Sequence, residues 1–203
     1  MRVLILFAHP ALEKSRVHRR LVRAVADLPE ITFHDLYEAY PDFQVDIARE
    51  QAQLSEHDLI VFQHPIYWYS PPALLKQWMD LVLQHGWAYG SQGNALVGKQ
   101  ALSALSTGGA ADAYQRTGFH GFTLRDFLVP IERSVTLCKM EYLPPFAVHG
   151  THRLDPAAIE RHAQQYRALI SAFRDDRVDL TALKGVAVLN DVLAQIIGQE
   201  VQA

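Results

Sequence analysis

The sequence contains only one cysteine, Cys138, among its 203 residues. A single thiol can form neither an internal disulfide nor a cysteine-based metal cage, which excludes disulfide scaffolds and the common zinc modules. No apolar run approaches the roughly 18 residues that a membrane-spanning helix needs. The apolar start at residues 3–8 also ends too soon for a signal peptide. These features favour a cytoplasmic protein.

The sequence also lacks an excess of basic residues. Its net charge is −3, so no broad basic surface is expected and we expect no nucleic-acid partner. The G-x-G-x-x-G fingerprint of nicotinamide-binding Rossmann domains is absent. Residues 93–99, GNALVGK, approach a phosphate-binding P-loop, but Gln100 follows where that motif needs Ser or Thr. That run also precedes a predicted strand, whereas a P-loop follows one.

Candidate metal ligands are sparse. His149 and His152 lie close together in the sequence. No third ligand is evident nearby, and their spacing fits no known metal cage. We therefore interpret both as ordinary loop residues and expect no metal site.

Short apolar runs alternate with amphipathic segments along the chain, which is typical of a parallel sheet with helices on both faces. The expected strands lie at residues 3–8, 31–36, 59–63, 100–106 and 142–148. The expected helices lie at residues 16–28, 46–54 (at the surface), 73–84, 123–139 (with a break or kink near Pro130), 155–174 and 185–197. No repeat or linker interrupts the chain, so we expect a single α/β domain over residues 1–203 with a helical extension from about residue 178 to 203.

Three loops leave the carboxyl ends of predicted strands, at residues 9–15, 63–72 and 106–121. In an open parallel sheet, ligands bind beyond these ends. We therefore expect residues from all three loops to meet around one ligand.

The first loop leads into a helix, whose free N–H groups and dipole attract anions. Ser15 can cap this helix and also donate its hydroxyl to a phosphate, and His9 lies at the end of the preceding strand. Alternatively, Ser15 is only a cap and His9 only a loop residue. Position alone leaves both interpretations open.

The other two loops offer an aromatic wall and a close backbone approach. The second, HPIYWYSPP, carries three consecutive aromatic residues between prolines, although packing of Trp68 and its neighbours in the core or in a dimer is an alternative. The third contains Gly108 and Gly109, which let the backbone approach a ligand closely. Tyr114 and His120 follow and could supply polar groups over that ligand, although a plain turn is the alternative.

Several motifs together give the chain a family resemblance. They are AHP at 8–10, YPDF at 40–43, HPIYWYSPPALLKQW at 64–78, HGWAYG at 85–90, TGG at 107–109 and LPPFAVHG at 143–150. With these motifs, the chain resembles the NAD(P)H dehydrogenase (quinone) family, and within it the ancillary proteins of the glutathione-regulated potassium-efflux system. The resemblance spans roughly residues 1–174 and implies a flavodoxin-like fold with a five-stranded parallel sheet of order 2-1-3-4-5.

The resemblance also implies roles for individual residues. It assigns a flavin phosphate to His9, Ser15, Arg16, Val17 and His18. It assigns the flavin ring and ribityl chain to Pro65, Ile66, Tyr67 and Trp68 on one side and to Ser106, Thr107, Gly108 and Gly109 on the other. Tyr114 and His120 are implied as the catalytic pair at the pyrimidine edge. Tyr89, from the partner subunit of a dimer, is implied in the substrate cavity with Trp68 and Tyr114.

The implied activity is a flavin-dependent NAD(P)H:quinone oxidoreductase that passes a hydride from NAD(P)H through the flavin to a quinone or similar electrophile. FMN is expected, with FAD as the alternative, because the chain has no obvious segment for an adenosine group. The resemblance also implies a homodimer. The alternative function is a regulatory ancillary subunit that activates a glutathione-gated potassium/proton antiporter, which would place the protein peripherally at the inner face of the cell membrane.

Overall fold

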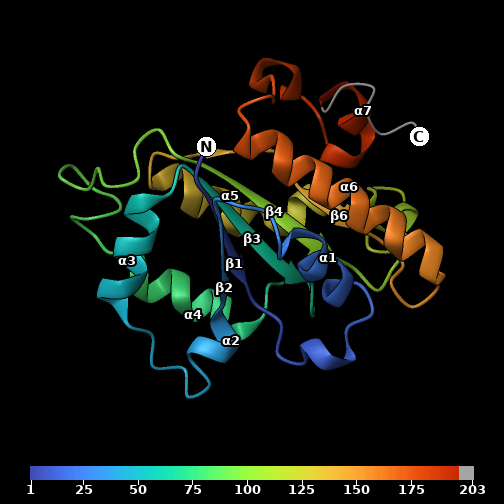
Figure 1. The fold of residues 1–203 in the computed structure, drawn as a ribbon, viewed down its shortest axis with the longest axis horizontal. Helices are drawn as coiled ribbons and strands as arrows, with labels where there is room; N and C mark the ends of the chain where they lie inside the picture. The colour runs from blue at the N-terminus through green and yellow to red at the C-terminus, as the bar shows by residue number, and fades with distance from the viewer. Residues whose placement is uncertain (197–203) are drawn as a thin grey trace.

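The computed structural model describes residues 1–196 and contains a parallel β-sheet with helices on both faces (Figure 1). Its strands are β1 (Val3–Phe7), β2 (Ile31–Asp35), β3 (Leu59–Pro65), β4 (Gln100–Ser106), β5 (Glu141–Tyr142) and β6 (Phe146–Val148). The order is β2-β1-β3-β4-β5, and β6 also pairs with β4. Every pairing is parallel. The predicted flavodoxin-like fold with strand order 2-1-3-4-5 is confirmed.

The fifth position of the sheet is filled by two short strands, and the single strand predicted at residues 142–148 is wrong in this detail. Pro144 and Pro145 lie between β5 and β6 and have no N–H group to donate to β4. Pairing with β4 therefore stops after Leu143, whose N–H donates to the carbonyl of Ala101, and resumes at Phe146.

Seven α-helices follow the strands within residues 1–196. They are α1 (His18–Val25), α2 (Leu36–Ala39), α3 (Ile47–Glu56), α4 (Ala73–Val82), α5 (Leu124–Leu137), α6 (Pro156–Arg174) and α7 (Leu193–Ile196). The predicted helix at 16–28 is shorter at both ends. Residues 15–17 form a turn in which Ser15 Oγ accepts from the N–H of His18, so the helix begins only there.

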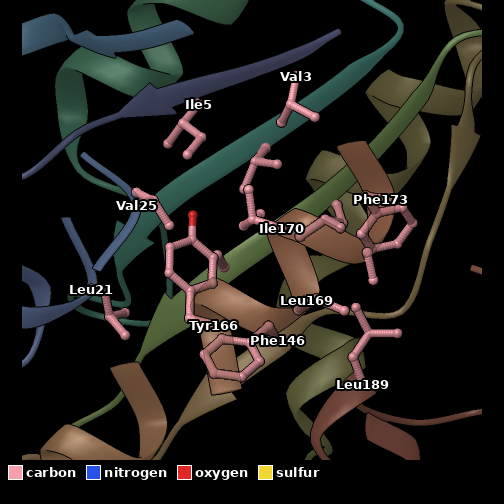
Figure 2. Close-up of a cluster of buried hydrophobic side chains, with 14 of the residues drawn as sticks. Val3, Ile5, Leu21, Val25, Phe146, Tyr166, Leu169, Ile170, Phe173 and Leu189 are labelled. Carbon is pink, nitrogen blue, oxygen red and sulfur yellow. The ribbon is translucent and has the colours of Figure 1, made fainter. Parts of the chain in front are cut away.

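Alternate residues of each central strand point to opposite faces of the sheet and create two cores. On one face Val3, Ile5 and Val61 pack against α1 and α6, as Figure 2 shows in part. On the other face Leu4 and Phe62 pack with the helices α3, α4 and α5. The central strands are therefore buried on both sides, and their carboxyl ends emerge together at one edge.

Helix α5 continues through Pro130, so of the predicted break or kink the break is wrong and the kink stays a prediction. Pro130 is exposed, and the carbonyl of residue 126, which loses its helical partner, can be hydrated there. A capping box between Thr123 and Asp126 fixes the start of the helix.

The segment after α6 packs on the first core instead of forming the long helix predicted at 185–197. Leu180–Leu183 and Leu189–Val192 are 3-10 turns, and α7 begins only at Leu193. Gly185 has φ +79° and Val188 is extended, so the backbone between the turns is not helical. Leu189 is fully buried, and its N–H donates to the carbonyl of Pro145. The last predicted helical residue, 197, and the rest of the tail lie outside the described residues.

Helix α3, predicted to lie at the surface, buries one carboxylate completely. Glu50 is 0% exposed, and it accepts hydrogen bonds from Nε2 of His34 at 2.8 Å, the hydroxyl of Tyr40 at 2.5 Å and Nε1 of Trp78 at 2.7 Å. Burial alone would raise the pKa of Glu50, but these donors outweigh it and the pKa is lowered. The ionised carboxylate thus ties α3 to β2, to the segment after α2 and to α4.

Candidate functional site

A cavity of about 550 Å³ opens at the edge of the sheet where β1, β3 and β4 end. It is lined by His9, Ala11, Lys14, Ser15, Arg16, Val17, Pro65, Ile66, Tyr67, Trp68, Ser106, Gly108, Thr151 and His152. The structure therefore brings Ser15, Trp68 and Gly108, one residue from each of the three strand-end loops, to a single cavity.

The first loop presents the hydroxyl of Ser15 and the imidazole of His9 to the cavity. Because Ser15 Oγ accepts from the N–H of His18, its own proton stays available to a ligand. His9 Nδ1 accepts from the N–H of Ala11 at 3.1 Å, so the ring proton lies on Nε2, 3.3 Å from the Tyr67 hydroxyl. Burial lowers the pKa of His9, partly opposed by Glu13. This end of the cavity therefore offers neutral donors together with the cationic side chains of Lys14 and Arg16.

His18 lies beneath the cavity and is not among its lining residues. The imidazole is 0% exposed, and its Nε2 lies 2.9 Å from Oγ of Ser106. Burial, reinforced by the neighbouring His9 and His64, lowers the pKa of His18 well below its ordinary value. The family resemblance implies that His18 contacts a phosphate. In this structure the neutral His18 ring instead lies under Ser106.

The second loop contains a strained aromatic turn. Tyr67 and Ser70 exchange two backbone hydrogen bonds of 2.9 and 3.0 Å around Trp68 and Tyr69. Both central residues have positive φ, 47° and 65°, as in a type I′ turn, where glycine and asparagine are preferred. The Tyr69 ring stacks on Phe127 with centroids 5.1 Å apart, which anchors the turn. Trp68 is left 93% exposed at the cavity, an unusual position for an indole.

The third loop places Gly108 at the cavity and Gly109 against aromatic side chains. A Cβ atom at Gly108 would lie 3.2 Å from Nε2 of His152, and one at Gly109 would lie 3.1 Å from Cε2 of Tyr114. The rings of Tyr114 and His120 have centroids 4.6 Å apart, beside Gly109. Neither ring lines the cavity, although His120 Nδ1 is buried without a hydrogen-bond partner among residues 1–196. Gly108 thus lines the cavity, and the next residue, Gly109, lies in close contact with the aromatic pair.

Thr107 is held behind the cavity wall. Its hydroxyl donates to the carbonyl of Gly109 at 2.8 Å, so Nδ1 of His149, 2.9 Å away, must carry a proton and donate to the Thr107 oxygen. Burial lowers the pKa of His149 and keeps this ring neutral. Thr107 therefore shapes the turn.

The sequence reasoning missed four lining residues, Ala11, Lys14, Thr151 and His152. Thr151 and His152 belong to a fourth loop at the same sheet edge, directly after β6. Interpreting His152 as an ordinary loop residue overlooked this position. The signal was available, because the last predicted strand also has a carboxyl end.

Tyr89 lies away from the cavity. It lines a separate groove of about 430 Å³ between α4 and α5, together with Met79, Leu83 and the 57%-exposed Leu137. Within one chain, Tyr89 therefore does not meet the residues expected around the flavin, and its role in a substrate cavity stays a prediction.

Among residues 1–196, no cluster of three or more His, Cys, Asp or Glu side chains is arranged to hold a metal ion. No helix in the same range has both the length and the apolar character to cross a membrane.

Comparison with known proteins places this geometry in a family. Residues 1–170 match the family described as having a flavodoxin-like fold. The chain is 46% identical over 165 residues to the glutathione-regulated potassium-efflux system ancillary protein KefG of Serratia proteamaculans, covering 81% of this chain and 90% of the relative.

Two solved structures are also similar. General stress protein 14 of Treponema denticola, in complex with FMN, superposes with a TM-score of 0.81 and 40% identity, covering 85% of this chain and 99% of that one. An NADPH-quinone reductase from P. pentosaceus superposes with a TM-score of 0.76 and 36% identity, covering 83% of this chain and 97% of that one. The match over residues 1–170, together with these relatives, shows that the chain belongs to the flavodoxin-like family.

Proposed function

We propose that the cavity binds FMN and that the protein is a flavin-dependent NAD(P)H:quinone oxidoreductase. The observation that carries this proposal is the meeting of Ser15, Trp68 and Gly108 at one cavity of about 550 Å³ at the carboxyl edge of the sheet. Support comes from the FMN complex of general stress protein 14, which shares 40% of its sequence with this chain. FAD stays the alternative cofactor.

The residues present fit a flavin mononucleotide. Lys14 and Arg16 supply positive charge at the end of the cavity where Ser15 offers a free hydroxyl, which suits a phosphate. Gly108 keeps the opposite wall free of a Cβ, which suits the close approach of a flat ring. Trp68 and Tyr67 provide an aromatic wall.

A bound flavin would supply two-electron hydride chemistry between NAD(P)H and a quinone or similar small electrophile. The protein's part is to hold the ring and to stabilise the charge that develops on it. Tyr114 and His120 are the candidate donors, because they lie directly behind Gly109 and carry a phenol hydroxyl and an unpartnered imidazole nitrogen.

The groove that contains Tyr89 supports the further proposal of a homodimer. Leu137 lines this groove and is 57% exposed, and Val129 on the same helix is 45% exposed. Exposed apolar side chains that gather at a groove mark interaction sites. A second copy seated on the groove would cover Leu137 and could bring its own Tyr89 toward the cavity.

A second candidate function is regulation of a membrane protein. The 46% identity to a potassium-efflux ancillary protein favours it. In this role the protein would be cytoplasmic and would bind a potassium/proton antiporter at the inner face of the membrane. Potassium flux at equal antiporter expression, with and without the protein, tests this role; equal fluxes would exclude it and leave the enzyme.

The enzyme proposal is tested by the absorption spectrum of the purified protein, identification of the released cofactor, and NAD(P)H oxidation with a simple quinone. We expect bound FMN and steady turnover. Tyr114→Phe should lower the turnover number on the order of 10²-fold, as the loss of one charge-stabilising donor does elsewhere. A colourless protein that takes up neither FMN nor FAD would exclude the proposal.

A further inference from the structure

A line of four buried polar side chains runs from helix α6 along one face of the sheet, the face covered by α1 and α6, to the floor of the cavity. It consists of Tyr166, Gln63, His18 and Ser106, of which the first three are 0% exposed and Ser106 is 6% exposed. The Tyr166 hydroxyl donates to Oε1 of Gln63 at 2.9 Å. Nε2 of Gln63 lies 3.5 Å from Nδ1 of His18, and Nε2 of His18 lies 2.9 Å from Oγ of Ser106. Figure 2 shows Tyr166 projecting from α6 with its hydroxyl directed toward the strands.

The line can carry its protons in only two consistent directions. In the first, Tyr166 donates to Gln63, the Gln63 amide donates to His18, and His18 donates through Nε2 to Ser106. In the second, the Gln63 amide is rotated, every bond is reversed, and the Tyr166 hydroxyl accepts from Gln63.

Burial selects between the two directions. In the reversed line the Tyr166 proton has no acceptor among residues 1–196, because Gln63 is the only recorded partner of that hydroxyl. A fully buried donor without an acceptor is strongly unfavourable. The first direction gives the Tyr166 proton an acceptor, and the second N–H of the Gln63 amide is in the same situation in both directions, so Nδ1 of His18 is the acceptor and Nε2 carries the proton.

The neutral state of His18 is required for this arrangement. A protonated ring has no lone pair on Nδ1 and could not accept from Gln63. Burial, aided by His9 and His64, lowers the pKa of His18 well below its ordinary value. The ring therefore stays neutral and keeps one donor and one acceptor.

We propose that Tyr166, Gln63 and His18 are positioning residues that orient the hydroxyl of Ser106 as a hydrogen-bond donor into the cavity. Ser106 accepts from His18, lines the cavity, and has no recorded acceptor for its own proton among the described residues. The ligand it suits is a ring with an acceptor oxygen or nitrogen at this wall. Identification of that ring as a flavin rests on the proposed function.

The first test measures the tautomer of His18 in the ligand-free protein from the ¹⁵N chemical shifts of its ring. We expect the proton on Nε2 in the wild type. In Tyr166→Phe the Gln63 amide is free to rotate, so the Nδ1–H form should appear. Tyr142→Phe is the matched control, because it removes a phenol hydroxyl bonded to Ser103, away from the cavity, and should leave the His18 shifts unchanged. A wild-type proton on Nδ1 would overturn the proposal.

The second test uses FMN as the probe. Ser106→Ala and Tyr166→Phe should each raise the dissociation constant of FMN about fivefold, the value of one hydrogen bond, while Ser106→Thr keeps wild-type affinity. Tyr166→Phe should have no further effect in the Ser106→Ala background. Independent, additive losses would show that Tyr166 does not act through Ser106.

The two tests separate this inference from the proposed function. If the wild type binds no FMN, the flavin proposal fails, and the tautomer of His18 still decides the direction of the line. If Tyr166→Phe does not fold, the wild-type tautomer and the comparison of Ser106→Ala with Ser106→Thr decide the inference.

Discussion

The aromatic rings of Tyr114 and His120 lie with their centroids 4.6 Å apart directly beside Gly109, the chain neighbour of Gly108 in the cavity wall. The absence of a side chain at this glycine makes the arrangement possible. A methyl group at this position would press on the Tyr114 ring, so a substitution of Gly109 tests whether the placement of the pair matters.

Gly109→Ala tests this relationship. The new Cβ would lie 3.1 Å from Tyr114 Cε2, so the Tyr114 ring would shift by a few tenths of an ångström relative to His120, whose Nε2 at 3.5 Å is in ordinary contact. We expect about a tenfold fall in quinone-reductase turnover with less than about 1 kcal/mol of destabilisation. Ala110→Ser, at the exposed neighbouring position, is the control in steady-state kinetics. Unchanged turnover in Gly109→Ala would argue against a role for the pair.

The strained turn at Trp68 gives a second prediction. Trp68 has φ 47° and is 93% exposed, so its side chain contributes little to folding while its backbone is unfavourable. Trp68→Gly should leave the free energy of unfolding unchanged or raise it by up to about 1 kcal/mol, yet weaken FMN binding. Denaturant unfolding and flavin titration measure the two effects. Trp68→Phe keeps the strain and an aromatic ring and is the control; a clear loss of stability in Trp68→Gly would contradict the interpretation.

The buried carboxylate of Glu50 gives a third prediction. Glu50→Gln removes a charge that accepts from His34, Tyr40 and Trp78 and leaves donors without a suitable partner. We expect a loss of about 3 kcal/mol in the free energy of unfolding. Glu56→Gln, at the exposed end of the same helix, should cost less than about 0.5 kcal/mol. Equal effects in chemical denaturation would show that the three contacts contribute little.

Burial of His64 predicts a pH dependence of stability. Burial lowers the pKa of His64 from 6.5 to about 4, while its Nδ1 donates to the carbonyl of Pro65. Between these two values the unfolded chain binds a proton that the folded protein excludes, so stability is full above pH 6.5 and falls as the pH drops toward 4. We expect a loss on the order of 2–3 kcal/mol from this group.

Unfolding by denaturant at a series of pH values measures this slope. His64→Leu removes one titrating group and should reduce the slope in that window by the contribution of that group, while His18, His9 and His149, whose pKa values burial also lowers, keep the remaining slope. A slope that is the same in the variant would assign the pH dependence to other groups.

The sequence was sufficient for the fold because the strands are short apolar runs with both faces covered. For example, β4 occupies the predicted residues, and Asp155 and Pro156 start α6 as their capping chemistry indicates. The errors arose where long-range contacts decide. The division of the last strand at Pro144 arises because β4 would need an N–H group from this residue to continue the pairing. The continuity of α5 depends on Pro130 facing solvent.

The loops that line the candidate cavity were predictable from the sequence, but the buried contacts beneath it were not. The rule that ligands bind at strand ends identified the loops of Ser15, Trp68 and Gly108. It could not show that His18 lies under Ser106, because that contact joins residues distant in the chain. It also gave no indication that Glu50, a charged residue on a polar helix, is completely enclosed.

The position of Trp68 also makes the protein its own spectroscopic reporter. Of the three tryptophans, Trp78 is fully buried and Trp87 is half-buried, whereas Trp68 is open to water at the cavity. The emission of Trp68 should therefore lie further to the red than that of the enclosed indoles, and the long-wavelength side of the emission spectrum should report mainly on Trp68. Quenching of this emission would register occupancy of the cavity without any attached label.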